Sequence, residues 1–115
     1  MDRFFWMYGK KLRGKPAASI CSLRRGGASA TVDQLNKYFA MYEMPIVTSI
    51  YWNMVHNGLC NGMITDAIEQ DAEGLQTMRI LGKNMAWLLK CIEVGKKQGI
   101  VQDAPEERYW TNFIR

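Results

Sequence analysis

Small and apolar residues form two short runs, 16–23 and 45–50, on either side of a helical pattern. Both runs are too short for a typical helix, and the second is rich in β-branched residues, so we expect two buried strands. Between them, after a glycine pair, apolar residues recur every three or four positions (Val32, Leu35, Phe39 and Tyr42). A helix that joins two buried strands is a βαβ unit, and such a unit predicts a parallel sheet of the α/β class.

The carboxyl ends of the two predicted strands are the expected location of any site, because ligands of open α/β sheets bind there. The first strand is followed by Arg24-Arg25-Gly26-Gly27 and the second by Tyr51-Trp52-Asn53. Large aromatic residues just past a strand end either pack under a loop or line a ligand or subunit contact. The single histidine, His56, has no serine or cysteine beside it in the sequence, so we expect a structural or solvated role and no catalytic triad.

Two further helices are predicted, one towards each end of the chain. Residues 2–9 have the composition of the end of a helix, dense in apolar side chains and followed by lysines. A long final helix is predicted to begin at a cap formed by Asp66 or Asp71 and to end after Lys97.

The apolar surface of the final helix is broad, because Trp87 and Leu89 fall outside its main apolar stripe. This breadth predicts contact with a second body, such as a partner subunit. After this helix the sequence continues with an acidic segment and then an aromatic one. We expect the aromatic segment to be docked on the protein rather than free (Tyr109, Trp110 and Phe113).

Composition narrows the class of protein. A chain of 115 residues is at most one ordinary domain, and 48% hydrophobic content with 23% charged residues is typical of a globular chain. The net charge of +4 is mild and comes without a recognisable nucleic-acid-binding module, so no nucleic acid partner is expected. There is no signal-peptide pattern and no apolar run long enough for a membrane span.

The three cysteines, Cys21, Cys60 and Cys91, are odd in number and far apart. They form neither a disulfide framework nor a metal-binding pair, so no metal is predicted and a reducing, cytoplasmic setting is expected.

The number of strands presents a problem for a complete domain. A doubly wound sheet usually has about five or six strands, and two are evident here. A two-stranded parallel sheet leaves both edges unpaired and gives its helices too little sheet to cover. The pattern is therefore that of the second half of a domain, spanning residues 1–115, with the N-terminal half missing.

The ordered motifs of the chain resemble the C-terminal half of flavodoxin-like NADPH-dependent FMN reductases. The motifs are Arg24-Arg25-Gly26-Gly27 before a helix, MPIVTSIYWN at 44–53, His56, EGLQTMRILGKNMAWLLKCIE at 73–93 and TNFIR at 111–115. They are most similar to the iron–sulfur flavoprotein branch, without its upstream cysteine cluster, so no iron–sulfur cluster is expected. The loop that holds the FMN phosphate in such proteins has no counterpart in this sequence.

The resemblance implies a cofactor, FMN, a reductant, NADPH, and one wall of the flavin-ring site. The implied cofactor-binding residues come from the turn after the first strand and from the aromatic pair (Arg24, Arg25, Gly26, Gly27, Ser29, Tyr51 and Trp52). Glycines let backbone N–H groups approach ring carbonyls, and an arginine near the ring favours the anionic reduced flavin. Two alternatives stay open: a tight turn with solvated arginines, and ordinary loop packing of the aromatic pair.

Two functions follow. In the first, the chain is part of an NAD(P)H-dependent FMN reductase that passes electrons through the flavin to an acceptor. In the second, it is a non-catalytic flavodoxin-like fragment that dimerises or exchanges elements to cover its open sheet. A homo-oligomer is expected in either case.

Overall fold

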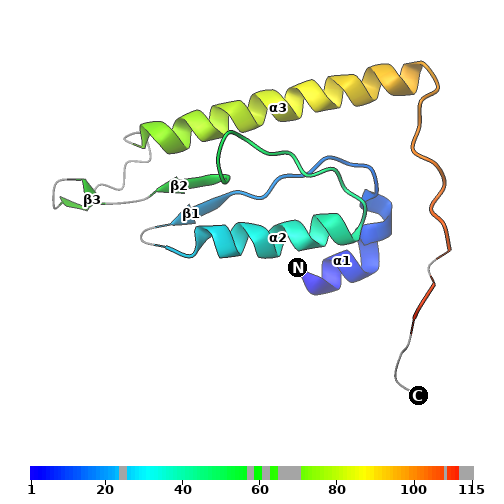
Figure 1. The fold of residues 1–115 in the computed structure, drawn as a ribbon, viewed down its shortest axis with the longest axis horizontal. Coiled ribbons are helices and arrows are strands. Elements are labelled where there is room, and N and C mark those ends of the chain that lie inside the picture. Colours follow the sequence, from blue (N-terminus) through cyan, green and yellow to red (C-terminus); the bar gives the residue numbers. More distant parts are fainter. Residues whose placement is uncertain (24–25, 57–58, 61–62, 65–70, 108, 112–115) are drawn as a thin grey trace.

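A parallel βαβ unit lies at the centre of the molecule (Figure 1). The computed structural model describes residues 1–23, 26–56, 59–60, 63–64, 71–107 and 109–111. Its elements are α1 (Asp2–Tyr8), the 3-10 helix η1 (Gly9–Leu12), β1 (Cys21–Leu23), α2 (Ala28–Met41), β2 (Met54–His56), β3 (Leu59–Cys60), β4 (Met63–Ile64) and α3 (Ala72–Lys97). The predicted α/β class is confirmed, as a small parallel sheet with a long helix; the flavodoxin-like assignment stays a prediction.

The two predicted strands do run side by side in parallel, but their paired residues are fewer and fall later in the chain. β1 pairs with β2 in a register that sets Leu23 opposite His56. A separate parallel bridge joins Ala17 and Ile46. The prediction that the second strand covers 45–50 is therefore wrong in its bounds, because that run contributes one bridge and the ladder lies further along.

Residues 48–52 leave the sheet between the bridge and β2, and polar contacts tie Thr48 and Ser49 to α3. Asn84 Nδ2 donates a hydrogen bond of 2.8 Å to the Thr48 carbonyl. Ser49 Oγ donates one of 2.7 Å to the carbonyl of Thr77. The first bond satisfies the Thr48 carbonyl, which would otherwise require a strand partner. The apolar pattern of the sequence carries no sign of either bond.

The helices α2 and α3 lie on opposite sides of the two strands (Figure 1). On the α2 side, Ser19 Oγ donates a 2.7 Å hydrogen bond to Asn36 Oδ1. On the α3 side, a Cβ added to Gly74 would lie 3.1 Å from Val55 Cα, so this glycine permits the close approach of α3 to β2. Among the described residues, no further strand pairs with the outer edge of β1 or of β2.

Helix α1 packs on the C-terminal half of α2 through the ring of Phe5, and the Tyr38 hydroxyl donates a hydrogen bond to Asp2 Oδ1. Phe5 is 5% exposed, and its ring stacks on those of Tyr38 and Tyr42 at centroid distances of 5.1 and 5.7 Å. Phe39 and Met44 complete this cluster. The helix predicted over residues 2–9 is thus confirmed. Most of its large apolar side chains are nonetheless exposed (Phe4, Trp6, Met7 and Tyr8).

Helix α3 begins and ends close to the predicted places. The Asp71 side chain caps it by accepting a hydrogen bond from the Gly74 N–H, and Lys96 and Lys97 occupy its last turn. Beyond the region over β2 it extends past the sheet (Figure 1). In the part of the chain that the structure describes, neither α3 nor any other helix combines the length and apolar character needed to cross a bilayer.

Candidate functional site

A hollow of about 620 Å³ lies where β1 leads into α2. Residues from the end of β1, the glycine turn and the first turn of α2 line it (Cys21, Ser22, Leu23, Gly26, Gly27, Ala28 and Thr31). Because β1 and β2 are parallel, this is the carboxyl edge of the sheet, where sites of open α/β sheets form. The structure therefore has a hollow at the first of the two predicted positions.

Gly27 sets the geometry at the start of α2. Its φ of 89° and ψ of −3° lie in the left-handed region that glycine adopts without steric cost. It is the N-cap residue of α2, and as a glycine it makes no side-chain capping hydrogen bond. Its carbonyl accepts the first helical bond from the Thr31 N–H at 3.0 Å and a second from Thr31 Oγ1 at 2.9 Å.

The absence of a capping side chain matters because the first N–H groups of a helix have no partner within it. These donors, together with the positive end of the helix dipole, favour an anion or a partly negative carbonyl oxygen. The N-terminus of α2 thus offers such a group both backbone donors and a favourable field.

The glycines also leave room beside the backbone. A Cβ placed on Gly26 or on Gly27 would meet no atom within 4 Å. Neither glycine is therefore required to avoid a clash within the chain. At Gly27 the positive φ explains why the residue is a glycine. At Gly26 the open space lets a flat ligand approach the backbone closely.

The predicted site residues are only partly brought together. Gly26 and Gly27 line the hollow, whereas Ser29 is exposed on the first turn of α2 and does not line it. Arg24 and Arg25 lie outside the described residues. Their role therefore stays a prediction from the sequence.

The aromatic pair does not stand at the carboxyl end of a strand, which corrects its predicted position. Tyr51 and Trp52 fall within residues 48–52, before β2, and neither lines the hollow. Each is 49% exposed, and their rings meet edge to face with centroids 4.6 Å apart. The physical reason is the departure of this segment from the sheet towards α3.

His56 occupies the strand end that the sequence assigned to the aromatic pair. It is the last residue of β2 and pairs with Leu23, so it lies at the same edge as the glycine turn. Its backbone N–H donates to Asp71 Oδ2 at 2.5 Å, and its Nδ1 lies 3.3 Å from the same oxygen. The imidazole is 47% exposed, so it is accessible at this edge.

Asp71 connects this edge to α3. Burial by itself would raise the pKa of its carboxyl, but the N–H groups of Gly74 and His56 and the adjacent imidazole outweigh burial and hold the pKa below its ordinary value. Asp71 is thus a charged acceptor that fixes both the end of β2 and the start of α3. His56 is half-exposed and tied to Asp71, in agreement with the structural or solvated role expected from the sequence.

The described lining of the hollow offers backbone N–H groups, two hydroxyl groups and the Cys21 thiol, and no base lines it beside that thiol. Cys21 Sγ, half-buried in the hollow, is 3.6 Å from the carbonyl of its neighbour Ser22. Across residues 1–23, 26–56 and the other described ranges, no three His, Cys, Asp or Glu side chains converge as metal ligands would. The arrangement suits binding and polarising a ligand better than covalent catalysis.

Comparison with known proteins gives one informative relative. The chain is 30% identical over 87 residues to a protein of Methanocaldococcus jannaschii named iron-sulfur flavoprotein. The match covers 74% of this chain and 45% of that protein, so the chain spans less than half the length of the relative. No protein-family model and no solved structure matches. The likeness supports a distant relation to flavoproteins.

Proposed function

We propose that this chain provides the ring-facing part of a flavin site in an NAD(P)H-dependent FMN reductase. The observation that carries the proposal is the uncapped N-terminus of α2 beside two unobstructed glycines, at the carboxyl edge of a parallel sheet. The likeness to an iron-sulfur flavoprotein supports a flavin over other planar anionic ligands.

The residues of the hollow fit a flavin ring in shape and polarity. Gly26 leaves the backbone open to a flat face, and the first N–H groups of α2 are suited to the ring carbonyls. Thr31 and Ser22 add hydroxyl groups to the lining. When bound, the flavin supplies the redox chemistry, accepting a hydride and passing on electrons, while the protein positions it and sets its electrostatics.

Charged residues at the same edge would tune the site. By sequence, Arg24 and Arg25 follow β1 directly, and their positive charge is expected to favour negative charge that develops on a bound ring. His56 lies at the neighbouring strand end, held by Asp71. Tyr51 and Trp52 each expose about half of their surface to solvent. Their proposed contact is with the flavin ring of a neighbouring subunit.

The direct test is flavin retention by the purified chain. We expect visible absorbance and quenched FMN fluorescence to persist after desalting, or to be recovered in a titration. Gly26→Leu should abolish this signal, because its Cβ would meet no atom within 4 Å and the rest of its side chain would extend into the hollow. Gly82→Leu is the matched control, since Gly82 on α3 also has open space around it. Equal binding by the two variants would contradict the proposed location.

A comparison of flavins separates ring binding from phosphate binding. If the α2 N-terminus contacts the ring, riboflavin and FMN should bind within a few fold of each other, and inorganic phosphate should not compete. FMN binding that is far tighter, and that phosphate abolishes, would assign the α2 N-terminus to the phosphate and overturn the ring-facing arrangement. If the purified chain binds neither FMN nor riboflavin, the result would favour a non-catalytic flavodoxin-like fragment.

A further inference from the structure

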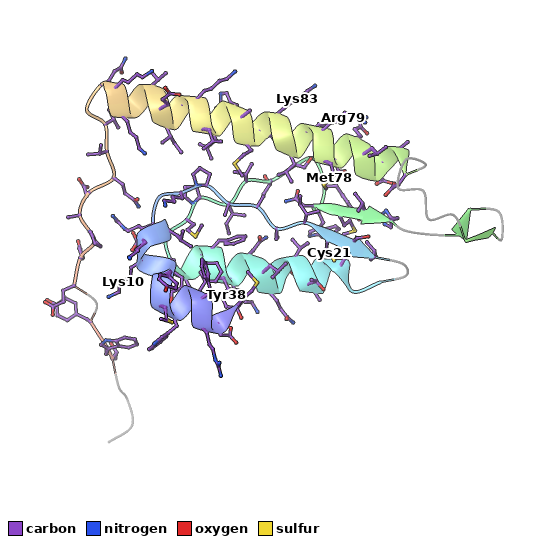
Figure 2. The ribbon with its side chains drawn as sticks, turned by 180° about the vertical axis from the view of Figure 1, so that it is seen from behind. Lys10, Cys21, Tyr38, Met78, Arg79 and Lys83 are labelled. Atoms are coloured by element: carbon purple, nitrogen blue, oxygen red, sulfur yellow. The ribbon has the colours of Figure 1, made fainter. Side chains whose placement is uncertain are left out.

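The outer side of α3 carries a regular row of lysines next to an apolar stripe. Lys83, Lys90 and Lys97 are spaced seven residues apart and are exposed. At about 1.5 Å of rise per residue, neighbouring lysines are separated by ~10.5 Å along the helix. Figure 2 shows Lys83 projecting from α3 on the side away from the strands, whereas Met78 lies on the side facing β2.

The apolar stripe borders this row and is open to solvent. Trp87 is 66% exposed and Val94 is 54% exposed. With Cys91 and Ile100 they line an open hollow of about 420 Å³, and Lys90 stands at its border. Exposed apolar surface of this kind next to like charges is typical of an interaction site.

The segment after α3 has the complementary character. Residues 101–107 are exposed and carry three acidic side chains (Asp103, Glu106 and Glu107), and Tyr109 follows with 91% of its surface exposed. In an extended chain at ~3.3 Å per residue, Asp103 and Glu106 are ~10 Å apart, which matches one interval of the lysine row. An aromatic side chain three residues further on would then fall near the apolar stripe.

The tail of the same chain is held away from its own α3. Arg13 Nη1 donates a 2.5 Å hydrogen bond to the Asp103 carbonyl, next to η1. From there the tail runs on past the α1 side of the molecule, away from α3 (Figure 1). The acidic segment therefore does not run back along α3 within one molecule (Figure 1).

We propose that two copies of this chain associate by exchange of their tails. The acidic residues of 103–107 and the Tyr109 side chain of each copy lie along the lysine row and apolar stripe of α3 in the other. Among the described residues, Lys97 has an intrahelical partner in Glu93 at 2.8 Å, while Lys83 and Lys90 have no ion pair. Direct pairing of two α3 lysine rows would set like charges against each other. The α3 helix of a second copy is therefore a poorer partner for this surface than its acidic tail.

Charge reversal in two matched variants tests the exchange. The helix variant carries Lys83→Glu and Lys90→Glu, and the tail variant carries Asp103→Lys and Glu106→Lys; all four positions are exposed, so the fold should persist. The wild-type chain should run in size-exclusion chromatography with light scattering as a dimer of 13.2 kDa subunits at low salt. Each variant alone should be monomeric, with a dimer Kd raised at least about tenfold.

An equimolar mixture of the two variants gives the decisive outcome. Every acidic helix then meets a basic tail and every basic helix an acidic tail, so the mixture should form a heterodimer. A control with Arg3→Glu and Lys10→Glu, the same charge change on α1 and η1, should stay dimeric. A monomeric wild type, variants that dimerise like the wild type, or a mixture that stays monomeric would each overturn the proposal.

Discussion

Replacement of Asp71 by alanine should destabilise the fold far more than loss of an ordinary surface carboxylate. The side chain is 11% exposed and joins two elements, accepting from the Gly74 N–H at 2.8 Å and from the His56 N–H at 2.5 Å. Removing it leaves the N-terminus of α3 uncapped and the last N–H of β2 without its acceptor.

The magnitude follows from these two bonds. Loss of an N-cap costs about 0.5–2 kcal/mol. Loss of a second hydrogen bond to a charged acceptor costs about 1.5–3 kcal/mol. The contact with the half-exposed imidazole of His56 is screened by solvent and adds little. We therefore expect Asp71→Ala to lower the free energy of unfolding by about 2–5 kcal/mol.

The effect should depend on pH in a defined direction. The pKa of Asp71 is lower in the folded chain than its ordinary value of 3.8, so the folded state favours the ionised carboxylate. Its contribution is therefore complete above the ordinary pKa and is lost as the pH falls through the lower folded pKa. The difference between wild type and variant should be constant near neutral pH and shrink only in strong acid.

Urea denaturation followed by circular dichroism measures this difference. With a slope of about 2 kcal/mol per molar urea, the midpoint of Asp71→Ala should fall by about 1–2.5 M. Asp33→Ala, at an exposed position of α2, is the control and should shift stability by less than about 0.5 kcal/mol. Asp71→Asn keeps a capping oxygen and should lie between the two. Equal midpoints for Asp71→Ala and Asp33→Ala would refute the reasoning.

Three further substitutions test other parts of the structure. Phe5→Ala empties the ring cluster between α1 and α2 and should cost about 3–5 kcal/mol in urea denaturation, whereas Trp6→Ala, at a side chain 79% exposed, should cost little; similar costs would contradict the packing. Gly27→Ala must adopt a φ of 89° and should lose about 1–2 kcal/mol of thermal stability; an unchanged melting temperature would argue against this turn. Asn53→Asp would bury a charge at a residue 5% exposed, so its melting temperature should drop at neutral pH and recover partly in acid; a neutral effect would mean that this side chain is solvated.

The sequence predicts the βαβ order and the helices well because these depend on local signals. The Val32 stripe marks α2, Asp71 marks the start of α3, and the glycine pair marks the turn after β1. Each signal lies within a few residues of the element that it sets, so no knowledge of the remaining chain is needed.

The sequence places the second strand badly because its position depends on side chains distant along the chain. Asn84 and Thr77 on α3 bind the segment that contains Tyr51 and thus remove it from the sheet. The position of His56 at a strand end could not be predicted for the same reason, since it depends on a register that only the pairing with β1 reveals. The prediction that the tail is docked is likewise not met within one chain at Tyr109, whose side chain is almost fully exposed.

The central claim is that the glycine turn and the α2 N-terminus bind a flavin ring, and amide chemical shifts test it at the residues themselves. A nitrogen–proton correlation spectrum recorded during titration with FMN should show its largest shifts at Gly26, Gly27 and Ala28, saturating with the change in flavin fluorescence. Riboflavin should produce the same pattern. Saturable shifts confined to other parts of the chain, or no shifts at high flavin concentration, would contradict the account.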